Sequence, residues 1–394
     1  MSFSKVSKKT LHHVACYRGK LTDVTLYRKS SLNLTKRWTG TEIKDVGDRV
    51  DDDVRSIQIS LGVCATPMTV KVVRFQPVEG DVVAQYWTVR EGEQGNEITK
   101  KKDLKPYCLE DIWATAAFFE KYIIDNAIPT IIRVHTPHRM LQETFVANDV
   151  VGRTYIMAVK YYYHLDGESQ SPAGKTANPQ KKLLGSLFVL WLAISHTTGS
   201  FYICGDDKLG MEPEVNDSTY PLFGRVATPP MLDAQLDSIN QHKVLSKYSR
   251  KVLRELEKCI YRNQSSYWWT IYICTFILLH QASCVTADRY RHARNEYGAK
   301  YRHFMSELTS EQHDLVMQTL TDSRIQNQLA IWKRYKEQNG MIERQPLSSP
   351  LQPHEAPYMG SQALLDWDHP CYWIAQMFEE RWQAHPTYKQ EFAG

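Results

Sequence analysis

The chain has 394 residues, 42% of them hydrophobic and 23% charged, which is normal for globular protein and compatible with one large domain or two packed ones. Its net charge of +4 is unevenly spread, because residues 1–40 hold nine Lys or Arg against Asp23 alone. The eight cysteines include no CxxC pair, so their spacing excludes a zinc cluster or finger.

Residues 1–40 are predicted to form a basic N-terminal arm. Such an arm can neutralise phosphates, or it can be a solvated terminus that binds nothing. The first ten residues, MSFSKVSKKT, contain no apolar core for a signal peptide. We therefore expect a cytoplasmic protein with reduced thiols.

Residues 41–165 are predicted to hold a small antiparallel sheet followed by the first helices. Three segments are rich in β-branched or aromatic residues with partial alternation, which is typical of strands. They are Ser56–Gly62, Met68–Phe75 and Val82–Val89. The polar segment Gly92–Asp103 is predicted to leave the sheet as a surface loop. Helical spacing of apolar residues begins at Leu109, and a second helix is expected from Pro137 to about Tyr162.

Residues 181–394 are predicted to form a helical domain, which the Gly/Pro/Ser/Asn-rich segment Asp166–Gln180 separates from the preceding residues. Leu183–Ile194 is too apolar to be exposed and predicts a core helix. A central helix is expected over about residues 264–300, because Asn263 to Ala287 contains no charged residue. That length is compatible with a membrane-spanning helix, but the polar side chains that interrupt the segment favour a buried helix of a globular protein.

Other helices are expected at 231–261, at 310–338 and around Trp373 to Trp382, with a proline-rich linker over 340–360. The predicted fold class is α+β and mainly α. It consists of a helical body around the buried central helix, with a small N-terminal antiparallel sheet.

A charged cluster directly follows the uncharged part of the predicted central helix. Residues three or four apart on a helix can meet, so Asp288 can contact Arg291 or His292. Such a cluster could bind a carboxylate, a phosphate or a nucleotide backbone, and His292 could act as a general acid or base. The alternative is a partly exposed helix end with internal ion pairs.

A second candidate site is the acidic segment CGDDKLGME, which follows the core helix. Asp206 and Asp207 lie between Gly205 and Gly210, with Glu212 two residues further on. Paired carboxylates on a tight loop could hold a cationic amine or guanidinium, or a magnesium ion. A solvated acidic turn is the alternative.

Six sequence blocks carry a resemblance to a fungal protein family. The blocks are RWTG at 37–40, VVRFQPVEGD at 72–81, GRTYIMAVKY at 152–161, FYICGDDKLGM at 201–211, WWTIYICTFILLH at 268–280 and QMFEERW at 376–382. Members are labelled hypothetical or described as C-terminal regions of Zn2Cys6 transcription factors. The resemblance implies a regulatory or interaction protein, and no cysteine spacing here supports the family's zinc-binding module.

The chain also resembles the fungal arginine-containing cyclodipeptide synthases, which join arginine from arginyl-tRNA to a second aminoacyl group as a diketopiperazine. This resemblance implies charged tRNAs as partners, no cofactor, no zinc and no membrane. The family's acidic motif has a glutamate three positions after its two aspartates, whereas Glu212 lies five after Asp207.

In that synthase, acidic side chains would receive the arginine guanidinium, arginines would hold acceptor-stem phosphates, and His292 would serve as the base. The implied catalytic residues are Asp288, His292 and Asp207. The implied substrate-binding residues are Asp206, Glu212, Arg289, Tyr290, Arg291 and Arg294. The synthase is our leading sequence-based hypothesis, and the regulatory protein is the alternative.

Overall fold

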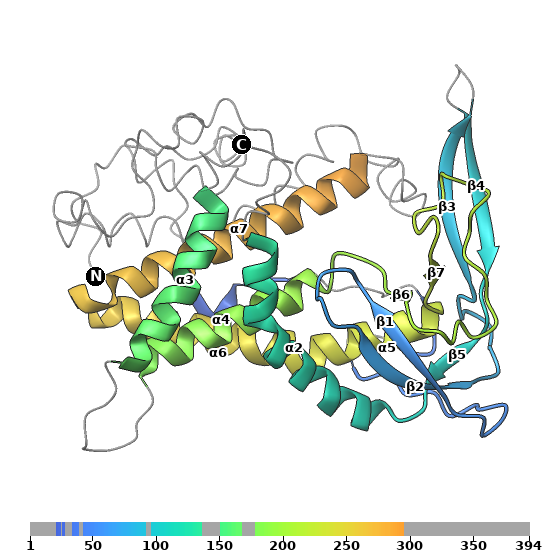
Figure 1. Ribbon diagram of the computed structural model, residues 1–394, viewed down its shortest axis with the longest axis horizontal. Helices are drawn as coiled ribbons and strands as arrows, with labels where there is room; N and C mark the ends of the chain where they lie inside the picture. Colours follow the sequence, from blue (N-terminus) through green and yellow to red (C-terminus); the bar gives the residue numbers. More distant parts are fainter. Residues whose placement is uncertain are drawn as a thin grey trace, which may run out of the picture.

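A computed structural model describes residues 21–24, 26–27, 34–38, 42–91, 96–135, 150–167 and 178–294. It shows a mainly helical body beside a small antiparallel sheet, which confirms the predicted fold class (Figure 1). The helices expected at 310–338 and 373–382, the linker at 340–360 and most of the basic arm lie outside the described residues. The division into segments 1–40, 41–165 and 181–394 stays a prediction.

The main sheet has five antiparallel strands in the order β5–β2–β1–β6–β7. Its strands are β1 Arg55–Ser60, β2 Met68–Arg74, β5 Tyr107–Leu109, β6 Tyr202–Ile203 and β7 Val226–Ala227. Alternation in β1 and β2 turns Ile57 and its partner Val70 into the core, while Lys71 is exposed. Because β6 and β7 come from distant sequence, the sheet joins the N-terminal part of the chain to the helical part.

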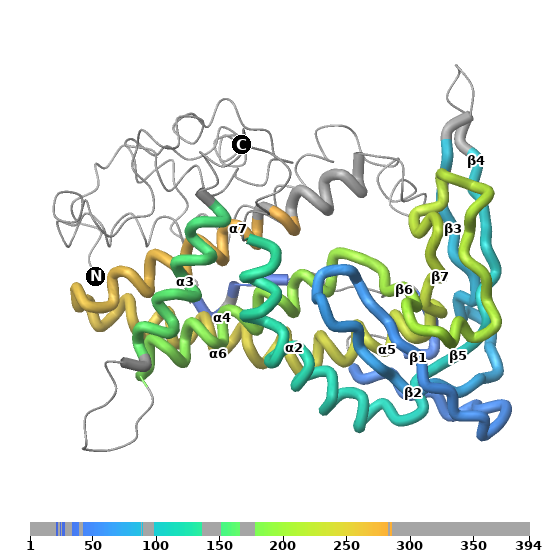
Figure 2. The backbone as a smooth tube through the Cα atoms, viewed as in Figure 1, coloured from blue at the N-terminus to red at the C-terminus, as the bar shows by residue number. Residues whose placement is uncertain are grey.

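The strands β3 Ala84–Glu91 and β4 Asn96–Asp103 form a separate two-stranded ribbon. Two sequence predictions are therefore wrong: Val82–Val89 does not join the main sheet, and most of Gly92–Asp103 is a strand. The polar composition of β4 concealed the strand because its lysines pair with acids from residues 204–225. That loop runs beside the ribbon (Figure 2), where Lys100 Nζ lies 2.8 Å from Asp217 Oδ2.

The helices are α2 Ile112–His135, α3 Val150–Gly167, α4 Pro179–Ser195, α5 Pro230–Ile239, α6 Ser246–Arg262 and α7 Trp268–Arg294. The helix α4 contacts α2, α3, α6 and α7, so it lies among them (Figure 1). It begins where the Asn178 side chain accepts a hydrogen bond from the Gln180 amide at 2.9 Å, with Pro179 in the first turn. From Leu183 to Ile194 it is almost wholly buried, as its apolar sequence predicts.

The helix expected at 231–261 is present as α5, the π-helical segment η2 Asn240–Leu245 and α6. A π turn holds more residues than an α turn, and here the wide turn carries Asn240. Its side-chain amide donates to the Ala193 carbonyl of α4 at 2.8 Å. The helix α6 ends at Arg262, and the residue that caps it, Asn263, adopts the left-handed conformation with φ of 49°.

The first half of α7 confirms the predicted buried helix. Ile273, Cys274, Phe276 and Ile277 are fully buried, and α7 contacts α4. Burial of an aliphatic or aromatic side chain stabilises the fold by about 1.5–3 kcal/mol, so this run holds α7 firmly in place. Within the described part of the chain, no helix is long and apolar enough to cross a membrane.

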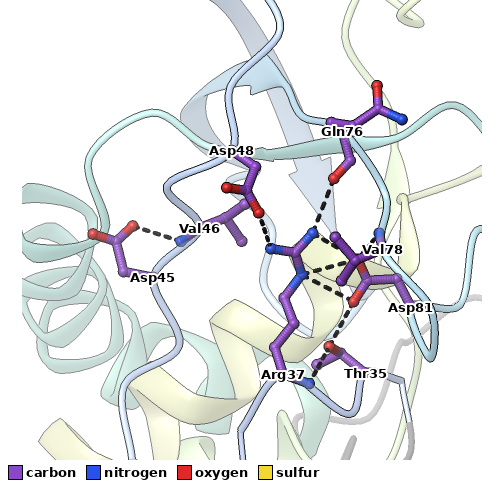
Figure 3. A network of polar contacts seen from close by, with 8 residues as sticks. All are labelled: Thr35, Arg37, Asp45, Val46, Asp48, Gln76, Val78 and Asp81. Atoms are coloured by element: carbon purple, nitrogen blue, oxygen red, sulfur yellow. Dashed lines mark hydrogen bonds and ion pairs between the residues drawn. The ribbon is translucent and has the colours of Figure 1, made fainter.

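An ion-pair network fastens the segment before β1 to the connection between β2 and β3 (Figure 3). Arg37 Nε donates to Asp81 Oδ2 at 2.9 Å, and its Nη1 donates to Asp48 Oδ2 at 2.7 Å. Its Nη2 donates to the Gln76 carbonyl at 2.9 Å. The Asp81 side chain is fully buried and that of Arg37 is 12% exposed, so this pair is part of the folded interior.

The carboxylate of Asp81 is satisfied from several sides. It accepts hydrogen bonds from the Thr35 hydroxyl at 2.7 Å and from the Val78 amide at 3.0 Å, in addition to those from Arg37. Burial alone would raise the pKa of Asp81, but these donors outweigh it and hold that pKa below its usual value. Two of the resemblance blocks, RWTG and VVRFQPVEGD, therefore meet in one structural network.

Candidate functional site

The acidic loop after β6 binds an arginine, and that arginine belongs to the same chain. Arg55 of β1 donates from Nε to Asp207 Oδ2 at 2.9 Å and from Nη2 to Asp207 Oδ1 at 2.5 Å. The Leu209 amide donates to the same Asp207 oxygen at 2.7 Å. The bidentate geometry is the one expected for guanidinium recognition, but it connects the loop to the sheet.

The turn that follows Asp207 is tight and left-handed. Leu209 and Gly210 have φ values of 57° and 64°, and Leu209 is fully buried. The φ of 64° at Gly210 is one that L side chains rarely adopt, so glycine suits this position. At Gly205 the reason is space, because a Cβ there would lie 3.0 Å from Gln58 Cβ of β1.

Asp206 and Glu212 have exposed side chains, and neither takes part in an ion pair with any described residue. Their side chains are open to solvent, whereas that of Asp207 is engaged by Arg55. The substrate-binding roles of Asp206 and Glu212, and the catalytic role of Asp207, stay predictions.

The rest of the loop is neutralised by the lysines of β4. Asp217 pairs with Lys100, and Glu214 pairs with Lys102 at 3.2 Å. Hydrogen bonds from Lys100 and from the Thr219 hydroxyl lower the pKa of Asp217 to about 2. Two of the five acidic residues in 204–225 thus hold the loop against the ribbon, and a third, Asp207, holds it against β1.

The charged cluster at the end of α7 lies on a helix, as the sequence predicts. The backbone is helical through Arg294, which places Asp288 on the same face as Arg291 and His292. The side chains of this cluster lie outside the described part of the structure. The contacts and roles predicted for them, including those of Arg289 and Tyr290, stay predictions.

Earlier on α7, His280 forms a buried polar cluster that the sequence analysis did not identify. The Tyr155 hydroxyl of α3 lies 2.8 Å from His280 Nδ1, and Cys284 Sγ lies 3.6 Å from His280 Nε2. The His135 ring at the end of α2 stacks on Tyr155 with ring centres 4.0 Å apart, and Trp191 of α4 lies against both rings. Four helices therefore meet at this cluster.

The Tyr155 hydroxyl and His280 Nδ1 share one hydrogen bond, and which of them donates depends on which ring nitrogen of His280 carries the proton. Burial raises the pKa of Tyr155 well above its usual value, and burial with the nearby His135 lowers the pKa of His280 to about 3.

The neutral His280 ring therefore has one nitrogen facing Tyr155 of α3 and the other facing Cys284 of α7. The cluster connects side chains from α2, α3, α4 and α7. Its evident role is to join the helices. The signal in the sequence was His280 and Cys284 four residues apart inside an uncharged run, but Tyr155 is 125 residues away.

The described residues contain no group of three or more His, Cys, Asp or Glu placed to hold a metal ion. The polar side of α6 is a further feature to which no role is assigned from the sequence, since only a helix is expected over 231–261. Its Lys and Arg side chains recur every three or four residues and are exposed, and this periodicity was the available signal.

A mainly helical α+β body, in which three of the five acids of the acidic loop pair with basic residues of the same chain, is compatible with a transcription-factor-like protein. A family comparison makes the class specific: the model for the KpeA transcription factor matches residues 23–325 of the 394. The chain belongs to the KpeA transcription factor family. No curated protein and no solved structure matches it. The family match confirms the transcription-factor-like resemblance and gives no support to the cyclodipeptide synthase.

Proposed function

We propose that this chain is a regulatory or interaction protein of transcription, related to the helical body of a Zn2Cys6 factor. The observation that carries the proposal is the match to the KpeA transcription factor family, which extends over the described residues from Asp23 to Arg294. The regulatory alternative drawn from the sequence blocks and this match agree on the class.

The geometry of the acidic loop supports the proposal over arginine-dependent synthesis. Asp207, one of the acidic residues assigned to the synthase site, already holds Arg55 through two hydrogen bonds. A substrate arginine would have to displace an internal partner that also connects β1 to the loop. The contacts of the loop indicate that it stabilises the fold. A stable body with a charged surface is compatible with a regulatory protein.

The proposal is tested by deleting the gene in the native host and comparing transcript profiles with those of the parent strain. We expect a reproducible set of transcripts to change and to return when the wild-type chain is restored. Chromatin immunoprecipitation of a tagged chain should enrich regions near those genes. Unchanged transcripts together with no enrichment would contradict the proposal.

A second assay addresses the synthase hypothesis directly. The chain is expressed in a host that supplies its own charged tRNAs, and the culture is analysed by mass spectrometry for cyclo-arginyl dipeptides. We expect no new product. A product that disappears when Asp288→Ala is expressed at equal level would overturn the regulatory proposal.

A further inference from the structure

The outward side of α6 is strongly basic. From Lys243 to Arg262 the sequence holds seven Lys or Arg against two Glu. Five of the basic residues on α6 recur at three- or four-residue spacing and so lie on one side of the helix. They are Lys247, Arg250, Lys251, Arg254 and Lys258.

Among the residues that the structure describes, the central members of this row have no acidic partner. Arg250, Lys251 and Arg254 are exposed, and no ion pair joins them to any of the residues that the structure describes. The two outer members pair with glutamates but keep about half of their side chains exposed: 57% for Lys247 and 53% for Lys258. A shallow groove follows the row. It is lined by Ser246, Lys247, Arg250, Lys251, Arg254 and Glu255.

The apolar side of the same helix is already covered. Val252, Leu253 and Leu256 are buried, and α6 packs against α4. A helix that binds a lipid surface needs free apolar side chains to enter the headgroup region. Because α6 buries its apolar side in the core, only its charged side chains are available to a partner. A membrane surface is therefore a less suitable partner than a polyanion.

The row has the length and charge of a phosphate-binding surface. At 1.5 Å per residue, Lys247 to Lys258 extends over about 16 Å of helix. One strand of duplex DNA presents roughly five phosphates over that distance, at about 3.4 Å each. Arginine can donate two parallel hydrogen bonds to a phosphate, and Arg250 and Arg254 are free to do so.

We propose that the exposed face of α6 binds the phosphate backbone of duplex DNA. This inference rests on the proposed function, because a transcriptional regulator is brought to DNA. The contact is independent of base sequence, since phosphates carry no sequence information.

The test measures binding of the full-length chain to a fluorescein-labelled duplex by fluorescence anisotropy, across a salt series from about 50 to 200 mM. Arg250→Gln/Arg254→Gln removes two phosphate contacts. We expect affinity at low salt to fall by about tenfold or more, and the slope of log K against log salt to become less steep by about 2. Two unrelated duplex sequences should respond equally.

The matched control is Lys71→Ala/Lys160→Ala, which removes the same charge from β2 and α3. Both lysines are exposed and have no ion pair with any residue in the described ranges. This variant should keep the wild-type salt slope. The charge-preserving variant Arg250→Lys/Arg254→Lys should also keep most of the wild-type salt slope. It distinguishes the effect of losing charge from the effect of losing the fold.

Equal slopes for wild type and the glutamine variant would overturn the inference, as would binding to phosphatidylserine vesicles without binding to DNA. In either case, altered transcripts in the deletion strain would leave the proposed function standing. If the glutamine variant melts at a lower temperature than wild type, the lysine variant and the two single variants decide the result.

Discussion

The loop at 204–225 and the outer face of α6 are both strongly charged, but they use their charge differently. In the loop, Asp207 pairs with Arg55 and Asp217 with Lys100. On α6, Arg250 and Arg254 have no acidic partner within the described residues. Charge of the first kind connects one part of the fold to another, whereas charge of the second kind is available to an outside molecule.

The difference shows that charge density alone is a poor guide to a binding site. In the sequence, the two adjacent aspartates made the loop a candidate binding site. The basic residues of α6 indicated only the polar side of a helix. A surface ion pair contributes about 0–1 kcal/mol, so leaving α6 unpaired costs the fold little. Substitutions should therefore separate the two regions by their effect on stability.

The largest effect should come from the most buried internal pair. Arg37→Ala leaves the Asp81 carboxylate buried and without its guanidinium, and breaking a buried pair from one side costs about 3–5 kcal/mol. Urea unfolding should show a loss of this size. Arg37→Ala/Asp81→Asn should recover part of it, because the remaining neutral amide is less costly to bury. A loss below about 1 kcal/mol would mean that the network is dispensable.

The next effect concerns an interior group that carries no charge at all. The pKa of His280 is about 3 in the folded protein and about 6.5 when unfolded, so below pH 6.5 the unfolded chain binds the extra proton. Stability from this group is therefore complete above pH 6.5 and is lost as pH falls, by about 1.4 kcal/mol per pH unit.

His280→Phe should flatten the dependence of unfolding free energy on pH by that amount between about pH 6 and 4. His196, whose pKa burial lowers to about 4, titrates in both proteins and cancels in the comparison. Tyr155, His135 and Cys284 face the ring and share its environment. Identical pH slopes for the two proteins would show that His280 is not held neutral.

A smaller effect should separate the two adjacent aspartates. Asp207→Asn weakens the contact with Arg55, which is about one quarter to one third exposed, and should cost about 1 kcal/mol. Asp206→Asn should cost almost nothing because its side chain is exposed. Thermal melting of the two variants measures the difference. Equal losses of stability would contradict the structural assignment of Asp207.

The smallest effect on folding is expected on α6. Arg250→Gln/Arg254→Gln should change unfolding free energy by less than about 0.5 kcal/mol, since exposed residues without partners contribute little. Because the same variant is expected to lose DNA affinity, stability and binding should separate. A large loss of stability would mean that Arg250 and Arg254 stabilise the fold, as the paired acids of the 204–225 loop do.

Much of the fold could be predicted from local pattern. The buried run Leu183–Ile194 and the uncharged start of α7 identified helices, and alternation identified β1 and β2. The strand β4 could not be recognised, because Lys100 and Lys102 resemble a solvated loop until their acidic partners are seen. Strand formation there depends on contacts more than 100 residues away in sequence.

The candidate site was less predictable for the same reason. Asp207 was identified by its acidic neighbour, but its partner Arg55 is 152 residues earlier. The hydrogen-bond partner of His280 Nδ1 is likewise distant in sequence, because Tyr155 comes from another helix. The basic periodicity of α6 was visible, yet only the structure shows that its apolar side is occupied and its charged side is open.

The wide turn at η2 sets the rotational phase of α6 relative to α5. Successive residues of an α-helix are rotated by about 100°, so deleting one residue between Asn240 and Leu245 would turn everything after it by that angle. Arg250 and Arg254 would then turn toward α4, and Leu253 and Leu256 would turn toward solvent. The π-helical segment η2 therefore determines which side of α6 is exposed to solvent. An insertion or deletion in η2 should destabilise the fold far more than a substitution there.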